Sequence, residues 1–193
     1  MPFPFVRQYD AMDCGPACIS MISRWHGRYL SLETIRNRAW ITREGVSFLG
    51  LKSAAESLGF KAIGVKIPFS KLSEKAPLPC IVHWEQNHFI VVNKIAKGKV
   101  WVSDPALGRI RLTTGEFLRG WSSDTSGESP SGMALFLEPG DEFTKLKDDP
   151  SPGNGLRFLL PYLKPHGKKI TLLVLGLIAG SLIQLVFPFL TQA

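Results

Sequence analysis

The chain has 193 residues, 45% of them hydrophobic, which is enough to bury the core of an ordinary domain and excludes a disordered tail. The 23 basic and 16 acidic residues give a net charge of +7, but no basic patch interleaved with aromatic residues occurs, so no nucleic acid is expected as a partner. Three cysteines without an apolar N-terminal signal peptide favour reduced thiols in the cytosol over a disulfide framework.

The first predicted element is a helix that begins at Cys14, within the stretch Q-Y-D-A-M-D-C-G-P-A-C-I-S-M-I-S-R-W. Asp13 is in the position of a cap, and Pro16 suits the first turn because its missing N–H is not needed there. A thiol at the start of a helix ionises more easily, since the free N–H groups and the helix dipole favour the thiolate. The apolar face of this helix consists of Cys14, Cys18, Met21, Ile22 and Trp25.

Each cysteine of this helix can be interpreted in two ways. A cysteine on an apolar face is ordinarily a small buried hydrophobic residue, and this is the expectation for Cys18. Cys14 differs in its neighbours, because Gln8 lies six residues earlier, Asp13 directly precedes it and Gly15 allows close approach of the backbone. A nucleophilic cysteine also needs a histidine base and a carboxylate that orients it.

Two shorter helices are predicted next. One covers Ser31–Arg38 with Ser31 as its cap, and the other begins after the cap Ser47 and stops at Gly59. The glycines of Gly45–Lys52 do not indicate a phosphate-binding loop, because the Gly-Lys-Ser/Thr ending is missing.

Beyond Gly59 the period changes from helical to strand-like. Ile63, Val65 and Ile67 are expected to alternate against Gly64 and Lys66 until Pro68 ends the strand. Helices first and consecutive strands later predict an α+β fold, with the N-terminal helices packed on a mainly antiparallel sheet. Further strands are predicted over Cys80–Trp84, His88–Ile95, Val100–Asp104, Gly108–Leu112 and Met133–Leu137, with a capped helix over Thr113–Trp121.

The predicted hairpin of the third and fourth strands carries a histidine and a carboxylate. A three-residue loop centred on Lys97 would place Asp104 opposite Ile90, on the same face as His88. A two-residue loop would put His88 and Asp104 on opposite faces unless a bulge corrects the register. Taken singly, His88 could be an ordinary strand histidine and Asp104 a turn former before Pro105. Together with Cys14 they form a set whose mechanism requires all three, whereas the rivals His26 and His83 have no carboxylate placed in this way.

Three motifs occur in order between Phe5 and Glu138: Q-Y-D-A-M-D-C-G-P-A-C, N-H-F-I-V-V and S-D-P-A-L-G. Together they resemble the bacteriocin-processing, double-glycine leader peptidase domain at the N-terminus of peptidase-containing ABC transporters. The resemblance implies a papain-like fold over residues 1–138 and a cysteine endopeptidase, or thiol protease, that cuts a leader from a precursor peptide after Gly-Gly or Gly-Ala. It implies Cys14 as nucleophile, His88 as general acid and base, Asp104 as the group that orients the imidazole and Gln8 as oxyanion-hole donor. It implies no metal and no cofactor for the peptidase.

The C-terminal part is predicted to reach a membrane. Residues 139–155 have the composition of a linker, 156–169 of an amphipathic interfacial segment and 170–191 of a first transmembrane helix. The 21 uncharged residues Ile170–Leu190 would cross a hydrocarbon layer of ~30 Å at ~1.5 Å per residue. Lys164, Lys168 and Lys169 precede this span, which predicts the peptidase domain on the cytoplasmic side of a bacterial inner membrane.

One helix forms no translocation path, and no Walker motif occurs. In the family that the motifs resemble, the remaining partner is the rest of the ABC transporter, a homodimer whose nucleotide-binding domain would use ATP and Mg²⁺. Two alternatives stay open: a catalytically silent module that only docks the leader peptide, and a different papain-like hydrolase or transferase that acts on amides.

Overall fold

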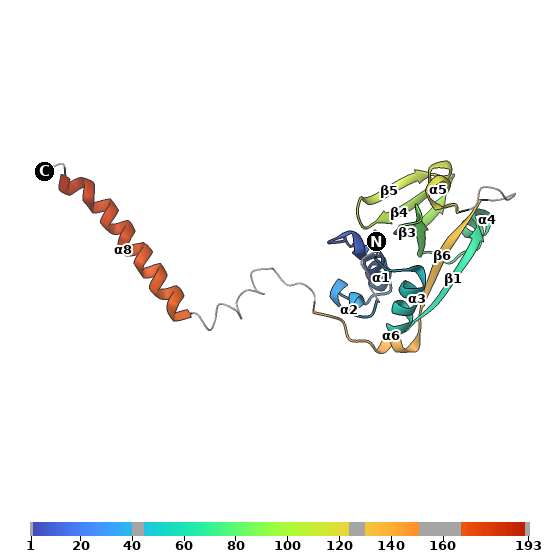
Figure 1. Cartoon of the computed structure of the whole chain (residues 1–193), viewed down its shortest axis with the longest axis horizontal. Helices are drawn as coiled ribbons and strands as arrows, with labels where there is room; N and C mark the ends of the chain where they lie inside the picture. Colours follow the sequence, from blue (N-terminus) through green and yellow to red (C-terminus); the bar gives the residue numbers. More distant parts are fainter. Residues whose placement is uncertain (1, 40–44, 124–129, 151–166, 192–193) are drawn as a thin grey trace. The chain divides into compact units, whose positions relative to one another are not determined.

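The computed structural model describes residues 2–39, 45–123, 130–150 and 167–191 of the chain. They fall into two compact units, Met1–Ser151 and Pro152–Ala193, which are described separately (Figure 1).

In the first unit, the two longest helices precede the strands in the sequence, and short helices lie between some of the strands. Its helices are η1 (Ala11–Asp13, a 3-10 turn), α1 (Cys14–Trp25), α2 (Leu32–Arg36), α3 (Phe48–Ser57), α4 (Phe69–Glu74), α5 (Thr114–Trp121) and α6 (Asp141–Lys145). Its strands are β1 (Phe60–Pro68), β2 (Cys80–Trp84), β3 (His88–Ala96), β4 (Lys99–Asp104), β5 (Gly108–Thr113) and β6 (Ser131–Pro139). The predicted α+β class is confirmed, whereas η1, α4 and α6 were not predicted.

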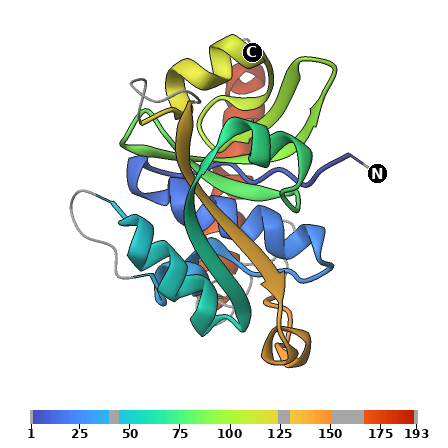
Figure 2. The same ribbon diagram turned by 90° about the vertical axis from the view of Figure 1, so that its right-hand side faces the viewer.

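The six strands form one sheet in the order β1-β6-β2-β3-β4-β5, and every pair of neighbours is antiparallel. The long strands β1 and β6 lie side by side, as Figure 2 shows. Three predicted caps are observed: the side chains of Ser31, Ser47 and Thr113 each accept a hydrogen bond from a backbone N–H in the first turn of α2, α3 and α5.

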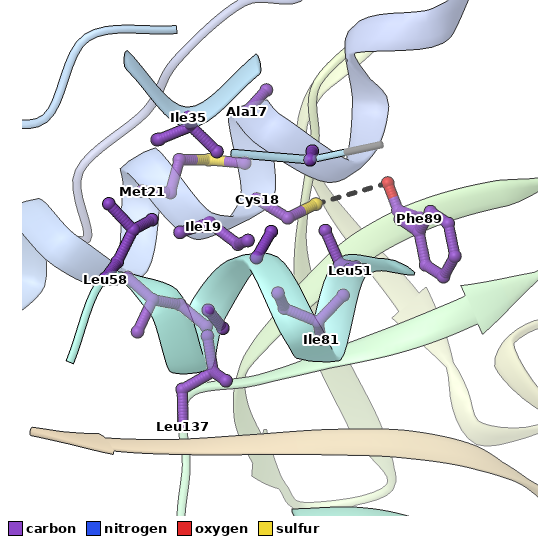
Figure 3. Close-up of a cluster of buried hydrophobic side chains, with 14 of the residues drawn as sticks. Ala17, Cys18, Ile19, Met21, Ile35, Leu51, Leu58, Ile81, Phe89 and Leu137 are labelled. Atoms are coloured by element: carbon purple, nitrogen blue, oxygen red, sulfur yellow. Dashed lines mark hydrogen bonds between the residues drawn. The ribbon is translucent and has the colours of Figure 1, made fainter. Parts of the chain in front are cut away.

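The sheet separates two hydrophobic clusters. Phe89 and Val91 of β3 belong to the cluster that contains α1 and α3, whereas Ile90 and Val92 belong to the cluster that contains α5. A strand buried on both faces is apolar throughout, which explains the continuous apolar run in this part of the sequence. Figure 3 shows the first cluster, in which side chains of α1 and α3 pack on the sheet.

The predicted strand is observed as β1 and ends at Pro68 as expected, but Ile63 differs from the other apolar positions in its exposure. Phe60 and Ala62 are buried, whereas Ile63 is 58% exposed. The strand begins at Phe60, and the face that it shares with Gly64 packs under α3; a Cβ at Gly64 would lie 2.5 Å from the ring of Phe48. Because the side-chain period of a strand is two, this contact places Ile63 on the opposite face, where Ile67 packs partly buried against the cluster that contains α5.

The hairpin between β3 and β4 has a two-residue turn rather than the predicted three-residue loop. Ala96 pairs with Lys99 across a turn at Lys97 and Gly98, both of which have positive φ. The register then shifts between Val92 and Lys94, so that nearer to Asp104 the pairs are Val92 with Val102 and Val91 with Ser103. This bulge supplies the correction that a two-residue loop requires, and His88 and Asp104 lie on the same side.

The first unit continues beyond the predicted domain end at residue 138. Phe143 of α6 is 1% exposed, and its ring centroid lies 4.1 Å from that of Phe60. Further on, Asp148 and Asp149 accept hydrogen bonds from backbone N–H groups of the segment between α1 and α2. Residues 139–150 are therefore not a free linker, because they are anchored by an aromatic contact and by hydrogen bonds.

The second unit contains the helix α8 (Gly167–Thr191), which includes the predicted helical span Ile170–Leu190. None of the helices in the described part of the chain meets the combined length and apolarity that a membrane crossing requires. The predicted transmembrane helix is therefore not confirmed. The predicted linker after residue 150 and most of the interfacial segment 156–169 lie outside the described residues.

Candidate active site

Cys14 is the first residue of α1, as predicted, and it is 5% exposed. The chain approaches it through the 3-10 turn η1, which is capped by Asp10: its side chain accepts a hydrogen bond from the N–H of Met12. This turn directs the chain into α1, so the sulfur lies at the positive end of a twelve-residue helix.

The predicted role of Asp13 as the side-chain cap of α1 is wrong. Asp13 occupies the cap position, but its carboxylate makes no capping hydrogen bond to α1. It accepts hydrogen bonds from the N–H groups of Tyr9 and Asp10, and it forms an ion pair with Arg36 of α2. The carboxylate of Asp13 binds Arg36 instead of capping α1, because a hydrogen bond to a charged partner is stronger than one to a neutral N–H. The sequence pattern around Cys14 does not show this contact, since Arg36 lies on another helix.

His88 and Asp104 are in direct contact at the ends of their strands. Nε2 of His88 lies 2.9 Å from Oδ1 of Asp104. The same oxygen accepts hydrogen bonds from the backbone N–H groups of Ala106, at 2.8 Å, and Leu107, at 3.3 Å. Burial raises the pKa of Asp104, but these hydrogen bonds outweigh it and hold the pKa below its ordinary value.

The imidazole of His88 lies between the carboxylate of Asp104 and the thiol of Cys14. Burial lowers the pKa of His88, but side-chain hydrogen bonds to Asp104 and Cys14 outweigh it and raise the pKa to about 9. Since Nε2 faces Asp104, Nδ1 is the ring nitrogen left for the sulfur. The interactions with Asp104 and Cys14 therefore favour the protonated form of the imidazole.

Gln8 lies beside the turn that follows Asp104. Its backbone N–H donates a hydrogen bond to the carbonyl of Pro105, at 3.1 Å. Its side chain is partly buried, and the oxygen Oε1 has no hydrogen-bond partner among the described residues. The structure thus brings Gln8 next to the Asp104 turn, on the segment that leads into Cys14.

The other cysteines and histidines do not share these features. Cys18 is fully buried, and its Sγ donates to the carbonyl of Phe89 at 3.3 Å (Figure 3). Burial raises the pKa of Cys18 and of Cys80, so both thiols stay protonated, as expected for Cys18. Burial lowers the pKa of His26 and of His83, and within the described residues neither forms an ion pair with a carboxylate.

The β2–β3 turn and the start of α3 line a cavity that the sequence patterns did not predict. Its volume is about 370 Å³, and it borders the start of α1, since a Cβ at Gly15 would lie 3.7 Å from Phe89 and one at Gly45 would lie 4.0 Å from Met12. Glu85 and Gln86 in the turn have positive φ, which is uncommon for residues other than glycine. The lining residues are Gly45, Val46, Ser47, Phe48, His83, Gln86, Asn87 and Phe89.

Among the residues that the structure describes, no group of three His, Cys, Asp or Glu side chains is arranged to hold a metal ion. The chemistry of the site is that of a thiol, an imidazole and a carboxylate in series.

A cysteine at the start of a buried helix and a histidine–aspartate pair on an antiparallel sheet define a papain-like cysteine peptidase. The Peptidase C39 family matches residues 2–125, well over half of the chain, and the chain belongs to this family.

Sequence relatives are processing and transport proteins. The chain is 34% identical over 143 residues to the lactococcin-G-processing and transport ATP-binding protein LagD of Lactococcus lactis, covering 72% of this chain and 19% of that protein. It is 30% identical over 196 residues to the lactococcin transport/processing ATP-binding protein LcnC-like of the same species, covering 98% of this chain and 26% of that protein. The chain thus spans a fifth to a quarter of the length of these relatives.

Solved structures share the fold. A double glycine motif protease from an AMS/PCAT transporter, in complex with the leader peptide, matches with a TM-score of 0.63 and 29% identity, covering 70% of this chain and 91% of that one. The peptidase domain of Streptococcus ComA matches with a TM-score of 0.63 and 26% identity, covering 71% of this chain and 98% of that one.

Proposed function

We propose that this chain is an active cysteine endopeptidase that removes the leader of a peptide precursor after a Gly-Gly or Gly-Ala pair. The support comes from the family, from relatives named for processing and transport, and from a structural neighbour described as a double glycine motif protease with its leader peptide. The observation that carries the proposal is the contact of His88 with both Asp104 and Cys14, because it gives the thiol a base and the base an orienting carboxylate.

In this proposal the Cys14 thiolate attacks the carbonyl carbon of the scissile bond. The sulfur–carbon bond forms while the carbonyl π electrons move to oxygen, and the side-chain amide of Gln8 stabilises that oxyanion. Protonated His88 then donates its proton to the leaving amine, and the peptide C–N bond breaks to leave a thioester on Cys14. A water molecule, deprotonated by His88, hydrolyses the thioester and restores the thiolate and the imidazolium. Asp104 keeps the ring oriented and stabilises its charge throughout.

The cavity beside α1 supports selectivity for small residues before the cut. Phe48 and Phe89 pack with ring centroids 6.3 Å apart, and His83 stacks on Phe89 at 5.0 Å, so rings occupy the space next to the start of α1. In this proposal the two residues before the cut pass between these rings and the start of α1, where glycine and alanine are accepted and larger side chains are excluded. The remainder of the leader is proposed to dock its apolar residues on the surface outside the cavity.

The alternative function is a silent module that docks the leader without cutting it. A docking role needs neither a thiol beside an imidazole nor a carboxylate behind it, and this chain has both. A different amide hydrolase or transferase of the same fold would keep the three groups but would not require glycine before the cut.

Incubation with a double-glycine precursor peptide and mass spectrometry of the products separates these functions. We expect cleavage after the second glycine by the native chain and none by Cys14→Ala with unchanged circular dichroism. Cys18→Ala is the matched control, because it removes a sulfur from the same helix and should still cleave. Binding without cleavage by the native chain would support the docking module, and cleavage by Cys14→Ala would reject the nucleophile.

The second part of the proposal concerns the larger protein to which the peptidase belongs and its place in the membrane. The match to the LcnC-like transport/processing protein extends over 98% of this chain, including its C-terminal segment. This supports placement at the front of an ABC exporter, a homodimer in the bacterial inner membrane with the peptidase on the cytoplasmic side and with ATP and Mg²⁺ bound by a separate domain. Flotation of the full chain with lipid vesicles tests the membrane placement, and recovery in the protein-only fraction would contradict it.

A further inference from the structure

Asp13 is a fully buried carboxylate that the proposed mechanism does not use. Its exposed fraction is 0%, although it directly precedes Cys14. Oδ2 accepts hydrogen bonds from the N–H groups of Tyr9, at 3.1 Å, and Asp10, at 3.4 Å. A buried charge requires a partner, and the backbone groups alone do not neutralise it.

Arg36 of α2 supplies the counter-charge in a forked arrangement. Its Nε donates to Oδ1 of Asp13 and its Nη2 to Oδ2 of the same carboxylate. Nη2 also lies 3.0 Å from Oδ2 of Asp10. The planar guanidinium thus binds both carboxylates that shape the turn before α1, with a directionality that an ammonium group lacks.

The atoms held by this ion pair belong to the segment that carries the proposed catalytic groups. Tyr9, whose N–H is bound by Asp13, follows Gln8, and Asp13 precedes Cys14. The other side of Gln8 is held by the bond of its N–H to Pro105, which is next to Asp104. We propose that Asp13 and Arg36 are positioning residues: their ion pair holds the Gln8–Asp13 turn so that the Gln8 amide faces the carbonyl attacked by Cys14.

This inference rests on the proposed function, since it assigns to the ion pair the geometry of an oxyanion hole. A purely stabilising role does not require this arrangement, because a buried ion pair is often no more stabilising than apolar residues of similar size. The carboxylate instead collects two backbone N–H groups and one guanidinium around a single turn, which fixes its shape.

The test compares Arg36→Gln with the matched control Arg38→Gln. Arg38 lies two residues further on, donates to the carbonyl of Ser57 and has no bond to Asp13 among the described contacts. We expect Arg36→Gln to lower kcat by ~10²-fold with a smaller change in KM, because a displaced oxyanion donor affects the transition state more than the bound substrate. Arg36→Lys keeps the charge without the fork and should give an intermediate kcat, which also covers the case in which Arg36→Gln does not fold.

A double-mutant comparison with Gln8 distinguishes a positioning role of Arg36 from a role in stability alone. In a Gln8→Ala background, Arg36→Lys should lower kcat by less than twofold, since the group that it positions is already absent. Equal losses in both backgrounds, or losses that merely follow the melting temperature, would overturn the inference.

Hydrogen exchange of the Tyr9 and Asp10 amides tests the same point without turnover. We expect both amides to exchange faster in Arg36→Lys than in the native chain or Arg38→Gln, while the interior of α1 stays protected. Unchanged exchange would overturn the inference even if the native chain cleaves peptides. If the native chain cleaves no precursor, the proposed function fails on that assay, and the exchange data still decide whether the ion pair holds the turn.

Discussion

At the scale of single residues, the charge of His88 is set by its two partners. Its pKa of about 9 lies above the ordinary value of 6.5, so folding favours the protonated ring. The stability that the protonated ring gains from its pair with Asp104 is complete from about pH 6.5 down to the acid range in which Asp104 itself takes up a proton, and it is lost as the pH rises through about 9. The same protonated ring is the general acid of the proposed mechanism, so stability and rate should decline together in alkaline solution.

The first prediction concerns this alkaline limit. We expect kcat/KM of the native chain to fall above about pH 9, where His88 loses its proton. Asp104→Asn removes the charge that raises the pKa of His88, so the limit should move to lower pH by about one unit or more, and kcat should also fall. The measurement is a pH profile of both chains, and an unmoved limit would show that Asp104 does not control the ring.

A second prediction concerns Gln8. If its amide binds the oxyanion, Gln8→Ala should lower kcat by on the order of 10²-fold while KM changes much less. Steady-state kinetics with a double-glycine precursor measures both constants. A change confined to KM would place Gln8 in substrate binding instead.

At the scale of elements, the register of the β3–β4 hairpin determines whether His88 and Asp104 meet. The two-residue turn alone would leave them on opposite faces, and one extra residue near Asn93 corrects this. Asn93 also donates a hydrogen bond to Ser103 at 3.0 Å.

The third prediction follows from this register. Deleting Asn93 should convert the hairpin to a regular ladder in which Val92 still faces Val102, so turnover should stay near the native level, with a stability loss of ~1 kcal/mol for the lost hydrogen bond. Inserting one alanine after Val102 should instead move Asp104 to the other face and abolish turnover. Kinetics and urea unfolding of the two chains measure these effects, and an active insertion variant would contradict the assignment.

Elements governed by local chemistry were predicted well. The serine and threonine caps of α2, α3 and α5 are side chains that bond to nearby N–H groups, so their sequence pattern is sufficient. The short helix α4 has no side-chain cap and was missed. The cap role of Asp13 and the hairpin loop length were wrong, because Arg36 and the bulge act through contacts between distant parts of the chain.

At the scale of the whole molecule, the peptidase unit includes a C-terminal strap, which we define as residues 139–150. The strap was interpreted from its Pro, Gly and charged residues as a linker, and composition does not show that the ring of Phe143 packs against those of Phe60 and His26. In the site, Cys14, His88 and Asp104 were predicted as a group because three ordered motifs point to one chemistry. Arg36 and the cavity were not, because no motif connects them to the cysteine.

The fourth prediction tests the strap. Phe143→Ala should lower the free energy of unfolding by ~3–5 kcal/mol, as expected for removing a buried ring. Phe136→Ala, at a partly buried position of β6, is the comparison and should cost less. Urea unfolding of both chains gives the values, and a loss below ~1 kcal/mol for Phe143→Ala would mean that the strap is not part of the folded unit.

The different surroundings of the three thiols allow intact active sites to be counted by chemical labelling. All three are free and buried, but Cys14 is 5% exposed and interacts with His88, whereas Cys18 and Cys80 are 0% exposed and burial raises the pKa of both thiols. A mild alkylating reagent should therefore add one label to the native chain and three after denaturation. The fraction of molecules that carries a single label then counts the competent sites in a preparation before any peptide is added.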